Sequence, residues 1–486
     1  MLTALQLNNI GFDYISELLE PCSPYGEQLR RRMRTYSPEE HGTLVCALEN
    51  LRTLALLFDR NNDAFVKAER ALMLLKDIRP SLKKSLEFTL TDVELFELKL
   101  FLIRLDVLCG AYRELCGKTE LENIDIHAFP EALDIIDPDG MRAMSFRVSD
   151  SCSEKIASIR RERRQTDILL RSAEGEEKEA LIVKRTQLTA EEENEDARLR
   201  TVMTENLRRF VPDIEKVTKS IAEFDFALAK VRLMKKAGGN IPTVNPSDGG
   251  KIFLSIKGMR NPAIEKALEA RGRRFVPINI ELGAGATVIT GANMGGKSVA
   301  LKTLALNVWL ALAGCPVFCT EAVIPHFSGI YLLYEDISSG AGGLSSFGGE
   351  MVRFNNILEA QKTEKLSLVL IDEFARGTNP AEGAALVRAA VRYFNSEKHA
   401  AALLTTHFDN IAPYAAAHYQ VMGLKNADKA ALNSALDRSG KNAAITLEDF
   451  MDYGLYRAEK NANPPRDALT VCRALHVSED FMKFVD

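Results

Sequence analysis

A glycine-rich octapeptide, GANMGGKS at residues 291–298, constrains the fold of this chain more than any other segment. It follows the short β-branched run ATVIT at 286–290 and precedes the helical pattern SVALKTLALNVWLALAG. A strand, a glycine loop and a helix in this order are the context of a phosphate-binding P-loop, because glycines let backbone N–H groups approach phosphate oxygens. The sequence therefore predicts an α/β P-loop domain with a parallel-rich sheet that binds and hydrolyses ATP.

The last two residues of the loop are expected to carry most of its chemistry. Lys297 would reach the β- and γ-phosphates, and the Ser298 hydroxyl would bind Mg²⁺. ATP and Mg²⁺ are therefore the predicted cofactors. The predicted nucleotide-binding residues of the loop are Gly291, Ala292, Asn293, Met294, Gly295, Gly296, Lys297 and Ser298.

Two further strands are predicted to end in functional side chains. LSLVLIDE, at 366–373, is a continuous apolar run typical of a buried parallel strand, and it ends in two carboxylates. Asp372 suits Mg²⁺, and Glu373 is expected to orient or deprotonate the attacking water. The strand at 402–406 ends at His407, which would sense the γ-phosphate by hydrogen bonding. An ordinary polar residue at a strand end is the alternative for His407.

The segment SSGAGGLSSFGGEM, at 338–351, lies between the glycine loop and the acidic strand. Its glycines and serines offer backbone donors and hydroxyls suited to phosphate, but many flexible loops have the same composition. On chemistry alone, both interpretations stay open.

The rest of the chain is predicted to be mainly helical. Residues 1–150 should form an all-helical core, in which Thr91 and Glu94 make a candidate capping box. Residues 151–237 should form a long-helix lever or coiled coil: a charged hairpin that reverses near 172–176, then a heptad seam from Leu207 that Pro212 interrupts. Structural packing is the alternative role of that seam. Residues 238–430 are predicted to be the ATPase domain, and 431–486 a C-terminal helical tail.

Composition excludes several classes of function. The formal net charge of -5 gives no global positive field for nucleic acid or anionic membranes. Eight cysteines occur without a CxxC pair, which makes a zinc site improbable. Because the N-terminus does not read as a signal peptide and no apolar stretch reaches the roughly 18 residues of a spanning helix, we expect a cytoplasmic protein without a membrane partner.

Taken together, these motifs resemble the MutS family, ATPases of the ABC group best known for DNA mismatch repair. The resemblance rests on TGANMGGKS, LVLIDEFARGT, LSSFGGEM and TTHF, and extends upstream to GFDYISELLEPCSPYG, EFDFALAKVR and IKGMRNPAIE. It implies that Asn293 acts beside the catalytic Glu373 and His407 by positioning the γ-phosphate. It also implies that Phe275 contacts adenine and that Ser345 reaches nucleotide bound to the opposite subunit. The ATP sites would then be complete only in a dimer, either a homodimer or a heterodimer with a related subunit.

The departures from the family pattern leave two functions open. The mismatch reader that precedes the family's helical core is expected to be absent, and the clamp is short, with about fifty residues between the lever-like helices. One function is a DNA-transaction ATPase whose dimer embraces DNA, with local support only from the basic clusters at 30–34 and 160–164. The other is ATP-dependent remodelling of a partner protein, similar to reactivases of cobalamin-dependent aminomutases. For the basic clusters, solvated helix faces are the alternative.

Overall fold

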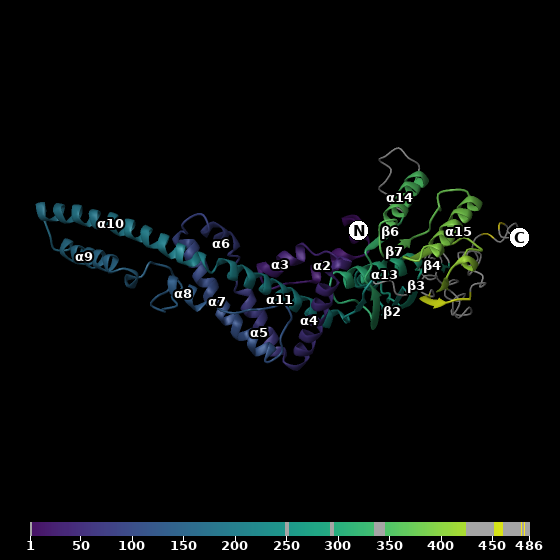
Figure 1. The fold of residues 1–486 in the computed structure, drawn as a ribbon, viewed down its shortest axis with the longest axis horizontal. Helices are drawn as coiled ribbons and strands as arrows, with labels where there is room; N and C mark the ends of the chain where they lie inside the picture. Colours follow the sequence, from purple (N-terminus) through teal and green to yellow (C-terminus); the bar gives the residue numbers. More distant parts are fainter. Residues whose placement is uncertain are drawn as a thin grey trace. The chain divides into compact units, whose positions relative to one another are not determined.

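The computed structural model describes residues 2–247, 252–291, 296–334, 346–423 and 452–459, with Ser478 and Phe481. The chain divides into two compact units. Unit 1 comprises Met1–Leu19, Met33–Arg52 and Lys230–Asp486, and unit 2 comprises Glu20–Arg32 and Thr53–Ala229. The described residues form fifteen α-helices and two mixed β-sheets (Figure 1). No helix among them combines the length and the hydropathy that crossing a bilayer needs.

The regular elements of unit 2 are all helices in the part of the chain that the structure describes. Thr91 caps one of its long helices through the predicted capping box: its hydroxyl accepts from Glu94 N, and Glu94 Oε2 accepts from Thr91 N. Its helices are α3 (Pro24–Arg31), α5 (Asn62–Met73), α6 (Arg79–Ser85), α7 (Asp92–Cys116), α8 (Pro130–Ile136), α9 (Glu154–Leu170) and α10 (Gly175–Arg208), while α4 (His41–Arg60) and α11 (Val211–Ala237) contribute residues to both units.

The predicted heptad seam forms a buried core helix. The chain leaves α10 at Arg208 and enters α11 at Val211, so the helix is interrupted next to Pro212, which sits in a first turn where no N–H partner is lost. Phe210 of this seam is half-buried, and its other seven positions are buried. These seven are Leu207, Ile214, Val217, Ile221, Phe224, Leu228 and Val231. Ala222 and Phe226 outside the seam are buried as well, so more than one side of α11 is packed.

Asp225 of α11 fixes the start of α3 within unit 2. Its buried carboxylate accepts hydrogen bonds from Cys22 N and Ser23 N, both at 2.8 Å, and from the Ser23 hydroxyl at 2.6 Å. Burial raises the pKa of Asp225, while these donors oppose the shift by stabilising the charged form. The chain reverses at 171–174, between α9 and α10. This overlaps the turn predicted near 172–176.

Unit 1 contains both sheets. The six-stranded sheet has the order β10-β9-β4-β8-β7-β6, and all of its neighbouring pairs are parallel except β10 with β9. The predicted parallel-rich sheet is therefore confirmed. Its strands are β4 (Gly285–Thr290), β6 (Gly329–Leu333), β7 (Ser367–Ile371), β8 (Ala400–Thr406), β9 (Ala417–Gly423) and β10 (Asp452–Arg457), and the four-stranded sheet consists of β1 (Thr243–Asn245), β5 (Glu321–Pro325), β2 (Phe253–Met259) and β3 (Ile278–Gly283).

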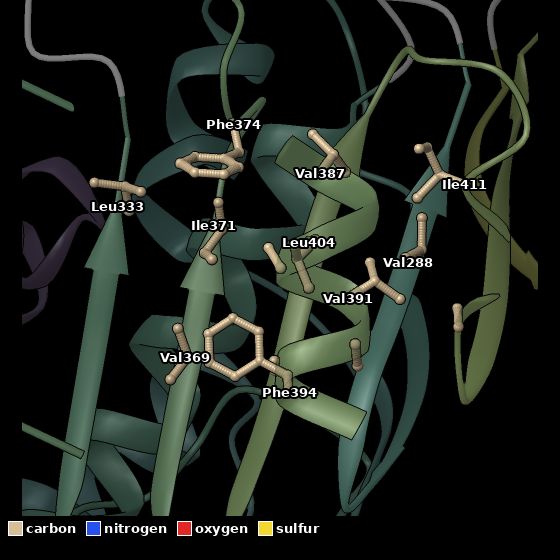
Figure 2. Close-up of a cluster of buried hydrophobic side chains, with 14 of the residues drawn as sticks. Val288, Leu333, Val369, Ile371, Phe374, Val387, Val391, Phe394, Leu404 and Ile411 are labelled. Carbon is tan, nitrogen blue, oxygen red and sulfur yellow. The ribbon is translucent and has the colours of Figure 1, made fainter. Parts of the chain in front are cut away.

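Helices cover the six-stranded sheet. Figure 2 shows Val387, Val391 and Phe394 of α15 (Pro380–Ser396) packed on Val369, Ile371, Leu404 and Val288 of the strands. Because side chains alternate along a strand, the intervening apolar residues face the other side. Helix α13 (Lys297–Leu312) is buried almost all round and packs on β6, β7 and β8 of this sheet and on β2 of the other. The remaining helices of the unit are α1 (Ala4–Asn9), α2 (Phe12–Leu18), α12 (Pro262–Glu269) and α14 (Ser346–Gln361).

One part of the predicted helical tail at 431–486 is a strand instead. Residues Asp452–Arg457 form β10, which pairs antiparallel with β9, for example Leu455 with Val421. The open edge of β9 explains this outcome, because its unpaired N–H and C=O groups accept a further strand. Most of the remainder of the tail lies outside the described residues.

The packing of Phe394 gives a test of this core. We expect Phe394→Ala to lower the free energy of unfolding of unit 1 by about 3–5 kcal/mol, because it removes a fully buried ring and leaves a cavity. Urea unfolding followed by fluorescence of Trp309, the only tryptophan of the chain, measures this unit. Val352→Ala, on an exposed side chain of α14, should change it by less than about 0.5 kcal/mol. Equal effects of the two substitutions would contradict the packing.

Candidate functional site

Three parallel strands bring the predicted motifs to one edge of the six-stranded sheet. Strand β4 ends at Thr290, which pairs with Thr406 at the end of β8, and Ile371 at the end of β7 pairs with Leu404 of β8. Carboxyl ends of parallel strands meet at the same edge, where ligands bind in open α/β sheets. The glycine loop after β4, the acidic pair after β7 and His407 after β8 therefore lie along this edge.

Lys297 is the first residue of α13 and contacts the first glycine of the loop. Its ammonium donates to the carbonyl oxygen of Gly291 at 2.8 Å and lies 3.4 Å from Oε1 of Glu373. The side chain is only 2% exposed. Burial lowers the pKa of Lys297, and the Glu373 carboxylate partly opposes that shift. The lysine is thus held between the first glycine of the loop and the residue that follows Asp372.

Glu373 occupies the centre of the charged cluster. Its Oε2 lies 3.3 Å from Nη1 of Arg376 and 4.0 Å from Nδ1 of His407, in addition to the contact of Oε1 with Lys297. Both Glu373 and Ala375 have positive φ, at 50° and 59°. Non-glycine residues held in this region cost about 1–3 kcal/mol each and cluster at functional sites. The strained turn after β7 thus turns the Glu373 side chain toward the lysine and the histidine.

Thr405 was not singled out by the sequence, although it connects the two carboxylate residues. Its hydroxyl donates to Oδ1 of Asp372 at 2.7 Å and accepts from the backbone N–H of Glu373 at 3.0 Å. Thr405 is buried in β8, next to the strand that carries the acidic pair. A threonine pair at the end of an apolar strand was the available signal, but only the pairing of β7 with β8 shows its target.

Helix α14 is joined to the turn that follows Glu373. Glu350 Oε1 accepts a hydrogen bond from Ala375 N at 3.3 Å, and the ring of Phe354 lies 4.5 Å from that of Phe374. Glu350 belongs to the predicted LSSFGGEM segment, whose earlier residues up to 345 lie outside the described residues. The described part of that segment is therefore attached to the turn that positions the acidic pair.

Residues from β9 and β10 support the base of the glycine loop. Gly296 has a φ of 89°, and a Cβ there would approach Cδ1 of Tyr453 to 3.1 Å. His418 lies 2.8 Å from the Thr290 hydroxyl through Nε2 and 2.9 Å from the Glu459 carbonyl oxygen through Nδ1. Since a carbonyl only accepts, Nδ1 carries the proton and Thr290 donates to Nε2. Burial lowers the pKa of His418, which agrees with a neutral ring.

Of the other predicted site residues, the structure describes Ser298 and Phe275. Ser298 is the second residue of α13 and is half-buried, and Phe275 is half-buried in the segment between α12 and β3. Ala292, Asn293, Met294, Gly295 and Ser345 lie outside the described residues.

The donors that the sequence assigns to Mg²⁺ fit that ion chemically. The Asp372 carboxylate and the Ser298 hydroxyl are hard oxygen ligands, and Mg²⁺ is usually bound by one or two protein oxygens together with substrate phosphates and water. The Thr405 hydroxyl donates to Oδ1 of Asp372, and so restricts how that carboxylate turns. Elsewhere in the described part of the chain, no group of three or more His, Cys, Asp or Glu side chains could hold a metal ion.

Comparison with known proteins agrees with this geometry. A family model described as MutS domain V matches residues 287–474, which include the glycine loop, the acidic strand and His407. This part of the chain is thus similar to the MutS family. It is 34% identical over 234 residues to endonuclease MutS2 of Fusobacterium nucleatum, a match that covers 48% of this chain and 28% of that protein.

Other relatives extend the same match. Endonuclease MutS2 of Halothermothrix orenii is 34% identical over 244 residues, covering 50% of this chain and 29% of the relative. DNA mismatch repair protein MutS of Listeria innocua is 30% identical over 295 residues, covering 59% of this chain and 32% of the relative. The chain therefore spans less than a third of the length of these MutS-family relatives.

The conformation of Gly296 gives a test of the loop geometry. We expect Gly296→Ala to lower the free energy of unfolding by about 1–2 kcal/mol, because an L residue is strained at this positive φ and its Cβ would press on Tyr453. Gly349→Ala is the matched control, since nothing lies within 4 Å of the added Cβ and alanine favours the helix by up to about 1 kcal/mol. Urea unfolding followed by Trp309 fluorescence measures both. A Gly296→Ala protein as stable as Gly349→Ala would refute the described conformation of Gly296.

Proposed function

We propose that this protein binds ATP with Mg²⁺ and hydrolyses it at the carboxyl edge of the six-stranded sheet. The observation that carries the proposal is the convergence of Lys297, Glu373 and His407, which come from three separate segments of the chain. A buried lysine directly after a glycine loop and beside two carboxylates has the chemistry of a nucleoside triphosphate site.

The proposed roles follow from the geometry of the side chains. Lys297 and the N-terminus of α13 bind the β- and γ-phosphates, and Asp372 and Ser298 hold the metal ion. Bound Mg²⁺ neutralises charge on the phosphates. Glu373 accepts a proton from the attacking water. The water oxygen bonds to the γ-phosphorus, and the bond from that phosphorus to the ADP oxygen breaks. His407 donates a hydrogen bond to the γ-phosphate.

The proposal also includes a dimer, in which Ser345 of each subunit reaches the nucleotide of the other. Asn293 would position the γ-phosphate, and Phe275 would contact adenine. Support comes from the similarity to the MutS family and from the attachment of α14 to the turn after Glu373, which links the LSSFGGEM segment with the acidic pair. ATP turnover in such a dimer would drive a conformational change of the helical unit.

The names of the relatives suggest DNA as the client of this ATPase, since they include endonuclease MutS2 and DNA mismatch repair protein MutS. The two basic clusters of the sequence give this idea little support. In the first cluster, Arg30 and Arg31 form ion pairs with Glu27 at 2.7 and 2.8 Å, and Arg34 with Glu40 at 2.6 Å. Charges already paired with carboxylates have little left for DNA phosphates.

In the second cluster, three of the four arginines are paired as well. Arg160 is buried, its side chain 3% exposed, among the carboxylates of Asp150, Glu192 and Asp196, at 2.7 to 3.0 Å. Arg163 lies 2.7 Å from Glu192. This pairing favours the second candidate function, in which the ATPase acts on a partner protein.

The roles of Glu373 and Lys297 are separable by experiment. We expect Glu373→Gln to retain ATP binding and to lower turnover by a factor of about 100 or more, because the amide no longer accepts the proton of the attacking water. Lys297→Ala should weaken ATP binding itself. Steady-state phosphate release and equilibrium binding of a fluorescent ATP analogue measure the two effects. Glu359→Gln, an exposed change on α14, is the control, and equal turnover in Glu373→Gln and wild type refutes the assignment.

A gel-shift titration decides between the two candidate clients. We expect duplex and branched DNA not to be retarded by the protein at 150 mM salt, and any retardation at 50 mM salt to fall steeply as salt is added, because most arginines of the two basic clusters are already paired with carboxylates. Retardation that persists at 150 mM salt, with or without ATP, favours the DNA-transaction function and argues against the protein client.

A further inference from the structure

The hairpin formed by α9 and α10 has charged residues in its seam. Arg160, Glu192 and Glu195 are buried between the two helices, with side chains only 2–8% exposed. Arg160 Nε lies 2.8 Å from Glu192 Oε1, and Lys155 Nζ lies 3.1 Å from Glu195 Oε2. Helix pairs in water usually place apolar residues in the seam and charges outside. Ion pairs therefore join the two helices, beside the buried apolar side chains of Ile159 and Leu188.

Ion pairs continue toward the turn. Lys184 Nζ lies 2.7 Å from Glu162 Oε1, and Arg185 Nε lies 2.7 Å from Asp167 Oδ1. The second pair brings the end of α9 level with the first turns of α10. Residues 168–183, here called the hairpin tip, therefore extend from a point where the two helices are fastened together.

Large apolar side chains are exposed on this hairpin tip. Ile168 is 63% and Leu169 54% exposed at the end of α9, and Ile182 is 49% and Val183 57% exposed on α10. Leu170 and Leu181 beside them are half-buried. Single exposed apolar residues are ordinary, but four of them near one turn, beside helices joined by ion pairs, are the pattern of an interaction surface.

The charge of the hairpin tip selects its partner. The tip contains four glutamates, at positions 174, 176, 177 and 179, but only one arginine and one lysine. All six side chains are exposed. This excess of negative charge repels DNA, anionic membranes and the same tip of a second copy. A protein surface with an apolar centre and basic residues around it is complementary to both the apolar side chains and the negative charge of the tip.

We propose that the hairpin tip docks onto a partner protein through an apolar patch surrounded by lysine or arginine. The four exposed apolar residues fill the centre of the interface, and the glutamates meet the basic surround. The ion pairs near the tip hold the two helices in place before binding, which lowers the entropy cost of docking. This docking needs neither ATP nor the residues of the nucleotide site, so it stands or fails separately from the ATPase.

Synthetic peptides test the proposal on the full chain. The probe is a fluorescein-labelled amphipathic helical peptide of leucine and lysine, and its counterpart has glutamate in place of each lysine. Fluorescence anisotropy at 150 mM salt should give at least tenfold tighter binding of the lysine peptide. The double substitution Ile168→Ser with Val183→Ser should weaken that binding at least tenfold, and Glu176→Lys with Glu177→Lys should weaken it by a similar factor.

Control variants distinguish binding at the hairpin tip from nonspecific hydrophobic binding of the peptide. Val107→Ser removes an equally exposed apolar residue from α7, 54% exposed, and should leave peptide binding unchanged. ATP turnover should be the same in all these variants as in wild type. Equal binding of both peptides, or binding that the tip variants do not weaken, overturns the proposal. So does sedimentation showing that the tip variants dissociate a self-associated form, since the occupant would then be a second copy.

Discussion

The parallel pairing of β4 with β8 and of β8 with β7 is the constraint on which the candidate site depends. It places Thr290, Thr406 and Ile371 near one edge, so that the segments following these strands meet although they lie far apart along the chain. Helices α13 and α15 stabilise the sheet by burying it, and no side chain of the site has to supply that stability. The strained turn at Glu373 is tolerated because this packed frame surrounds it.

Strong local patterns predicted much of this arrangement. A β-branched run before the glycine loop and a continuous apolar run before two carboxylates are the patterns of buried parallel strands, and both were found as strands. The capping box at Thr91 and the helix interruption next to Pro212 depend on neighbouring residues, and both are present. In each case, the interaction that decides the structure lies within a few residues of the pattern.

The residues that were missed act across the sheet. Thr405 bonds to the Asp372 carboxylate and to the Glu373 backbone across the sheet, and His418 and Tyr453 lie against Thr290 and Gly296, more than a hundred residues earlier in the chain. Their roles depend on strand order and on the strand β10, which the sequence did not predict. The ion pairs between α9 and α10 were hidden for a similar reason. A run of charges has the same composition whether it faces water or a neighbouring helix, and only the pairing of Arg160 with Glu192 distinguishes the two.

The most direct test of the central claim is a structure of the protein with Mg²⁺ and a non-hydrolysable ATP analogue. The account predicts the γ-phosphate within about 3 Å of Lys297 Nζ, and Mg²⁺ about 2.1 Å from the Ser298 hydroxyl oxygen, with Asp372 beside it. Glu373 should face the side of the γ-phosphorus opposite the ADP oxygen. Nucleotide bound away from the loop at 291–298, or phosphates that leave Lys297 in contact only with Gly291 and Glu373, would contradict it.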